Sequence, residues 1–65
     1  MWIVIHIAKG KAARDRIVAA LEADGVLVRV KEADQIAQET NHYYQICVLH
    51  AEAEQAKALL RRLGV

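Results

Sequence analysis

The sequence contains a single cysteine, Cys47, and has no proline and no phenylalanine among its 65 residues. One cysteine excludes a disulfide within the chain, and the first residues lack both the basic start and the long apolar stretch of a signal peptide. These two features predict a reducing, cytoplasmic setting. The apolar run at residues 2–8 is also far too short to cross a bilayer, so we expect no membrane association.

Neither sign of charge dominates, because nine Lys and Arg residues face eight Asp and Glu residues and leave a net charge of +1. The charges are scattered along the chain, so no single-sign field attracts nucleic acid or a membrane, and we expect neither partner. Apolar residues make up 55% of the chain. We predict a single domain, residues 1–65, whose core is so small that oligomerisation would add to its stability.

The apolar pattern predicts three strands and two helices. Residues 2–8, 26–31 and 43–50 have the composition or the alternation of strands. Residues 11–24 and 52–63 repeat apolar side chains every three or four positions, as helices do. Gly25 and Gly64 follow these helices directly, where a left-handed residue ends a helix. Residues 32–42 are rich in acids and amides and predict a long loop.

The element order βαββα predicts an α+β fold. A right-handed crossover makes the first two strands parallel, and the third strand then inserts between them. The expected result is a three-stranded sheet of order 1-3-2 with two helices on one face, the ferredoxin-like split unit without its fourth strand. The fourth strand would pair beside the first, so we expect residues 2–8 to form a long apolar edge, and such edges are rarely left bare.

Strand alternation divides the side chains of this sheet between two faces. We expect one face to receive both helices and the other face to form a dimer interface. The helix-covered face is predicted to carry Ile3, Ile5, Ile7, Val26, Val28, Val30, Tyr44, Ile46 and Val48. The predicted dimer interface consists of Trp2, Val4, His6, Leu27, Tyr43, Cys47 and Leu49, beside the polar residues Arg29, Lys31 and Gln45.

The chain has a recognisable overall pattern. Its parts are the opening strand Trp2-Ile3-Val4-Ile5, a helix that ends Leu21-Glu22-Ala23-Asp24-Gly25-Val26, the strand Tyr44-Gln45-Ile46-Cys47-Val48, and the closing Ala53-Glu54-Gln55-Ala56-Lys57-Ala58-Leu59-Leu60. This pattern resembles a group of short bacterial βαββα proteins that are named signal-transducing proteins and whose domain has no established function. The likeness covers nearly the whole chain and implies the fold, but its matching residues are structural and imply no chemistry.

Catalytic and metal-binding interpretations centre on Cys47 and His6, which alternation would place near each other on the open face. Two ligands alone are too few for a metal, although a two-fold dimer would bring together four. No Cys-x-x-Cys or His-x-x-x-His spacing is present. His50 falls on the opposite strand face from Cys47, and no basic cluster adjoins the thiol. We therefore predict no enzymatic activity, no metal and no cofactor.

Two further interpretations concern anions and RNA. Lys9, Gly10 and Lys11, with Arg14 one turn on, form a weak candidate anion site at a helix start, and solvated lysines are the simpler interpretation. Trp2, Tyr43 and Tyr44 suggest base stacking on a sheet, but alternation turns Tyr44 toward the helices and breaks the analogy.

The sequence thus predicts a non-enzymatic interaction or regulatory module that forms a homodimer through its first strand or its open sheet face. The alternative is a small-ligand sensor whose pocket lies at a dimer interface near Gly10 and residues 32–42.

Overall fold

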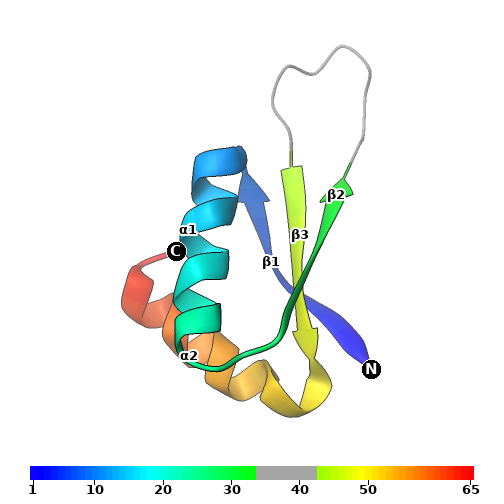
Figure 1. The fold of residues 1–65 in the computed structure, drawn as a ribbon, viewed down its shortest axis with the longest axis vertical. Coiled ribbons are helices and arrows are strands. Elements are labelled where there is room, and N and C mark those ends of the chain that lie inside the picture. The colour runs from blue at the N-terminus through cyan, green and yellow to red at the C-terminus, as the bar shows by residue number, and fades with distance from the viewer. Residues whose placement is uncertain (34–42) are drawn as a thin grey trace.

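A computed structural model of the protein describes residues 1–33 and 43–65 (Figure 1). The elements are β1 (Trp2–Lys9), α1 (Lys11–Ala23), β2 (Val28–Ala33), β3 (Tyr43–Leu49), a 3₁₀ turn (His50–Glu52) and α2 (Ala53–Leu63). The predicted loop at 32–42 is wrong at its start, because residues 32 and 33 continue β2, and its remainder lies outside the described residues.

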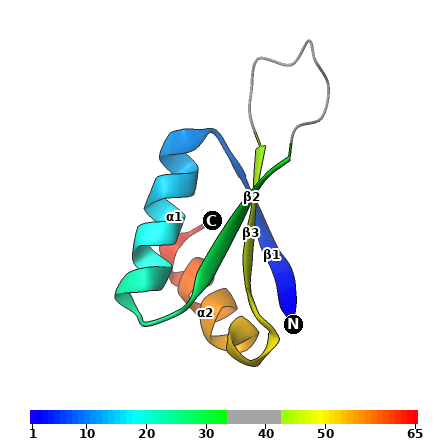
Figure 2. The same cartoon turned by 45° about the vertical axis from the view of Figure 1, so that its right-hand side comes forward.

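The three strands form one antiparallel-paired sheet of order β1-β3-β2, and this confirms the predicted topology. Both helices lie on the same side of the sheet (Figure 2). In the described part of the chain, no helix covers the other side of the sheet (Figure 2). Neither described helix is long and apolar enough to cross a membrane.

Gly25 and Gly64 end the two helices in the left-handed conformation, with φ of 83° and 80°. After α1, the amide of Gly25 donates to the carbonyl of Glu22 and the amide of Val26 donates to that of Leu21. This pair of bonds is a Schellman motif, in which the residue after the glycine packs back onto the helix. Val26 is accordingly buried in the core and belongs to the turn, so β2 begins at Val28 rather than at Val26.

The core fills the space between the sheet and the helices. Ile17 and Leu21 of α1 and Ile46 and Val48 of β3 are its largest fully buried side chains. The predicted apolar stripe of α2 is confirmed, since Ala53, Ala56 and Leu60 are buried and Leu59 and Leu63 pack against the core.

Polar side chains at the start of α2 hold the turn between α1 and β2. The side-chain Nε2 of Gln55 donates to the backbone carbonyl and to the carboxylate of Asp24, at 3.2 and 2.9 Å. The carboxylate of Glu52 accepts a hydrogen bond of 3.2 Å from the backbone amide of Leu27. These bonds join residues far apart in the sequence and fix where β2 enters the sheet.

A β-bulge in β1 changes which of its side chains face the helices. Val4 pairs with Cys47, but His6 pairs with Ile46, so the partner strand advances by one residue while β1 advances by two. One extra residue reverses the alternation of everything that follows it. The predicted position of Ile7 on the helix-covered face is therefore wrong: Ile7 is 48% exposed, and Ala8 is fully buried in its place.

The same bulge makes the predicted position of His6, near Cys47 on the open face, wrong. Its register partner is Ile46, whose side chain is buried beneath the helices, and the register partner of Cys47 on β1 is Val4. His6 and Cys47 are consequently not cross-strand neighbours on one face of the sheet.

Candidate functional site: the open sheet face

The open face is the surface of the sheet that points away from both helices. On β3, the open-face residues are those that alternate with the buried core residues. On β1 and β2, they are the register partners of those open-face β3 residues. They are Trp2, Val4, Ile7 and Lys9 of β1, Tyr43, Gln45, Cys47 and Leu49 of β3, and Arg29 and Lys31 of β2.

Large apolar side chains form a row on the β1 side of this face. Trp2 is 38% exposed, and Val4 and Ile7 are each 48% exposed. The bulge is the reason that Ile7 continues the row begun by Trp2 and Val4. Sequence reasoning missed Ile7, because the whole of β1 is apolar apart from His6 and Lys9 and nothing in it marks the position of a bulge.

Cys47 is covered even though it faces away from the helices. Its side chain is only 4% exposed, and its register neighbours are Val4 and Arg29. The guanidinium of Arg29 lies 5.1 Å from the centre of the Trp2 ring, so these two side chains meet across the central strand in a cation–π contact. The thiol therefore lies beneath a cover contributed by both edge strands.

This arrangement offers little for metal or catalytic chemistry. A reactive thiol is accessible and lies in an electropositive site beside a base. Cys47 is covered, its Sγ is 4.0 Å from the carbonyl of Gln45, and His6 is in a different register row. Residues 1–33 and 43–65 contain no group of three or more His, Cys, Asp or Glu side chains arranged to hold a metal ion.

The remaining predicted interface residues separate into two groups. Tyr43 and Leu49 are half-buried and belong to the open face. Leu27 is 60% exposed and lies in the turn before β2, outside the paired strands. Leu27 is thus not part of the sheet, and the prediction of strand residues from Val26 onward is the source of that error.

The candidate anion residues do not form one group. Lys9 and Lys11 are exposed at the start of α1, where Gly10 has φ of 88° and caps the helix. Arg14 instead lies over the ring of Tyr44, 4.7 Å from its centre, and forms an ion pair of 2.8 Å with Asp15. The guanidinium is therefore engaged on the helix side of the sheet.

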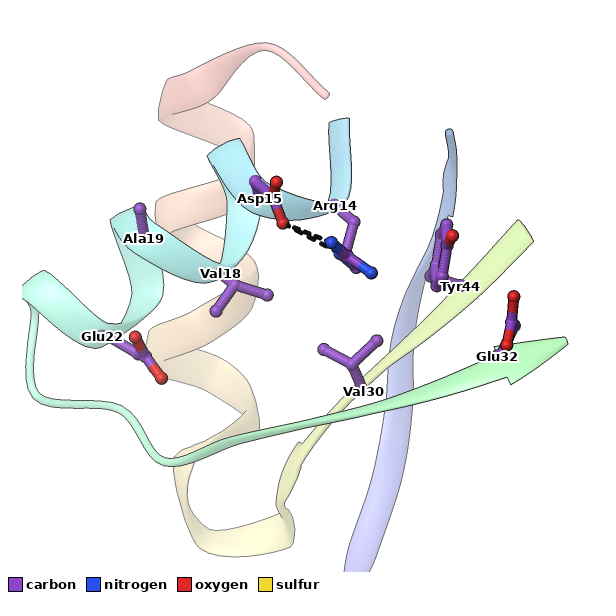
Figure 3. Close-up of a pocket in the computed structure, with 8 residues that line it drawn as sticks. All are labelled: Arg14, Asp15, Val18, Ala19, Glu22, Val30, Glu32 and Tyr44. Carbon is purple, nitrogen blue, oxygen red and sulfur yellow. Dashed lines mark hydrogen bonds and ion pairs between the residues drawn. The ribbon is translucent and has the colours of Figure 1, made fainter. Parts of the chain in front are cut away.

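Arg14 and Tyr44 line a groove between α1 and β2, with a volume of about 500 Å³ (Figure 3). Val18 of α1 and Val30 of β2 face each other across its floor, as Figure 3 shows. The carboxylates of Asp15, Glu22 and Glu32 complete its lining together with Ala19. The sequence predicted a pocket near Gly10 and residues 32–42 at a dimer interface. No pattern in the sequence indicated a groove between α1 and the edge strand β2.

Comparison with known protein families, with curated proteins and with solved structures finds no match to this chain. The likeness to short bacterial βαββα proteins therefore stays a prediction. The open face and the groove are the features of the fold on which a function can rest.

Proposed function

We propose that the protein is a non-enzymatic interaction module that forms a homodimer by pairing the outer edges of β1 from two copies. The observation that supports this most is the character of β1. It is eight residues long, pairs with β3 on one side, and exposes three large apolar side chains beside its other edge. Natural edge strands are protected by proline, by charges, by bulges or by a covering element. Of these devices β1 has the bulge between Val4 and His6 and one charged residue, Lys9, at its end.

Two-fold pairing of β1 with its copy would be antiparallel and would create a six-stranded sheet with the two β1 strands at its centre. The apolar rows of the two copies would then lie side by side. Lys9 of each copy would lie at an opposite end of the new pair, so the two ammonium groups stay apart. Main-chain hydrogen bonds between the two β1 strands and the burial of apolar surface would both stabilise this dimer.

The charges on the open face disfavour the other dimer, in which two open faces pack against each other. Arg29, Lys31 and Lys9 are all basic, and a face-to-face dimer would bring these side chains into one apolar interface. Desolvating like charges without opposite charges is costly. Edge pairing leaves the same side chains in water, so the charge distribution favours pairing through β1.

Amide hydrogen exchange at two protein concentrations tests this pairing residue by residue. At high concentration we expect the outward-pointing amides of β1 to exchange slowly, and on dilution to exchange faster as the dimer dissociates. The outward amides of β2, the other edge strand, are the matched control and should exchange rapidly at both concentrations. Rapid exchange of outward β1 amides under conditions where the protein is dimeric would place the interface elsewhere.

The groove between α1 and β2 supports a second candidate function, recognition of a small organic cation with an apolar body. Its floor is apolar, and Glu22 contributes a carboxylate to its lining beside the ion pair of Arg14 and Asp15. Such a ligand would bury its apolar part over Val18 and Val30 and keep its ammonium beside the carboxylate of Glu22.

A thermal-shift screen of aliphatic and aromatic amines tests the groove. A ligand that binds only the folded state raises the melting temperature as its concentration exceeds its Kd. We expect Ala19→Arg, which introduces a bulky cation into the groove lining, to remove the shift. Ala12→Arg, an equivalent change at an exposed position of the same helix, should retain it. The absence of any shift, or equal shifts in the two variants, would contradict ligand binding here.

A further inference from the structure

The two sides of the sheet carry different charges. The charged side chains on the open face are Lys9, Arg29 and Lys31, and all three are basic. The described acidic residues all lie elsewhere: Asp15, Glu22 and Asp24 on α1 and its cap, Glu32 in the groove lining, and Glu52 and Glu54 at the start of α2. Although the net charge of the chain is balanced, the open face carries only basic charges among residues 1–33 and 43–65.

The basic and the apolar side chains of this face come from different edge strands, and only Arg29 among the described side chains is seen to reach across to the apolar row, at the Trp2 ring. The exposed apolar row of Trp2, Val4 and Ile7 lies on β1, and the cations Arg29 and Lys31 lie on β2. The central strand β3 runs between them. At about 4.8 Å per strand, the backbones that carry the two rows are about 10 Å apart, which is close to the diameter of an α-helix.

An α-helix seated along β3 would therefore meet both rows at once. Arg29 and Lys31 are two residues apart on one strand face, a spacing of about 6.6 Å. Carboxylates at positions i and i+4 of a helix are about 6 Å apart along its axis and match this spacing. Apolar side chains on the adjoining stripe of the same helix would lie over β1.

Single-stranded nucleic acid fits this face less well. Nucleic acids bind sheets by stacking successive bases on neighbouring aromatic side chains. Trp2 lies opposite Leu49 and Tyr43 lies opposite Lys9, at opposite ends of β3 and so about 20 Å apart. The exposed side chains of β1 between these aromatics, Val4 and Ile7, are aliphatic and offer no surface on which a base could stack.

We propose that the open face binds an acidic amphipathic helix of a partner protein, seated along β3 with its apolar stripe over Trp2, Val4 and Ile7 and its carboxylates against Arg29 and Lys31. This inference rests on the proposed interaction role but not on the β1 dimer, because all of these residues belong to one copy.

Selection of binders from a display library of random 16-residue peptides tests the chemistry of the partner. We expect the enriched peptides to carry two acids four residues apart. On the adjoining face of the same helix we expect aliphatic or aromatic residues spaced three or four positions apart. The Kd of a synthetic copy of the leading peptide should rise at least 30-fold for Arg29→Glu combined with Lys31→Glu. Lys31→Glu alone, which leaves the Arg29 contact with Trp2 in place, should raise it at least fivefold.

Lys57→Glu combined with Arg61→Glu is the matched control, because it reverses two exposed cations on α2. We expect its peptide Kd to stay within twofold of that of the unmodified protein. A library that yields no binder, binders without the paired acids, or equal losses in both double variants would overturn the proposal. Binding of a 12-residue oligouridine that is lost in the Arg29 and Lys31 variant would assign the face to nucleic acid instead.

The sedimentation mass of the unmodified protein, measured in the same buffer, separates this proposal from the dimer. A monomer that binds the selected peptide would contradict the β1 dimer and support the helix site. A dimer that selects no peptide would support the β1 dimer and contradict the helix site.

Discussion

Replacing Ile46 by alanine should remove about half of the free energy of unfolding. Ile46 is at the middle of the central strand and fully buried between the sheet and the helices. Truncating a buried isoleucine costs about 2–5 kcal/mol, because the cavity that it leaves closes only in part. A chain of this length has a total stability of about 3–10 kcal/mol at the usual values per residue. Urea unfolding followed by circular dichroism measures the loss.

Leu27→Ala is the control for Ile46→Ala. Leu27 is 60% exposed and lies outside both the core and the proposed interface. Its truncation should change the free energy of unfolding by less than about 0.5 kcal/mol. Comparable losses in the two variants would show that the sheet does not pack against the helices as described.

Replacing both Val4 and Ile7 by lysine should convert the dimer to monomer while the fold persists. Both side chains are 48% exposed in one copy, so a lysine is accommodated there without entering the core. In the β1 pair the four new ammonium groups would lie side by side on the open face, where they would repel one another and replace the contact between the two apolar rows. A disrupted residue at the centre of an interface costs about 2 kcal/mol or more, so we expect the dimer Kd to rise by roughly 30-fold or more.

Leu27→Lys provides a control, because it introduces a lysine at a position more exposed than Val4 or Ile7 but outside the sheet. Its dimer Kd should equal that of the unmodified protein within about threefold. Far-ultraviolet circular dichroism of each variant at high concentration shows whether both helices remain. A Val4 and Ile7 variant that dimerises as tightly as the Leu27 variant would exclude β1 from the interface.

The predictable part of the fold depends on local signals. Gly25 and Gly64 marked the ends of the helices, because a left-handed residue is needed there whatever the tertiary context. The spacing of Ile17 and Leu21 gave the buried face of α1. The sheet order followed from the split βαβ unit, in which the third strand inserts between the first two, and this depends on the order of the elements rather than on particular side chains.

The unpredicted part depends on pairing between segments far apart in the sequence. The bulge at residues 4–6 arises where β1 meets β3, and it moves Ile7 onto the open face. Val26 looked like the first residue of a strand, but it completes the turn after α1. Alternation placed Cys47 on the open face, but it did not show that the thiol is covered there, where Trp2 and Arg29 meet across β3.

Sedimentation equilibrium of the unmodified protein tests the central claim most directly. If β1 pairs with its copy, the mass should approach twice the chain mass of 7.3 kDa at high concentration and fall toward 7.3 kDa on dilution. A mass of one chain at every concentration would contradict the homodimer.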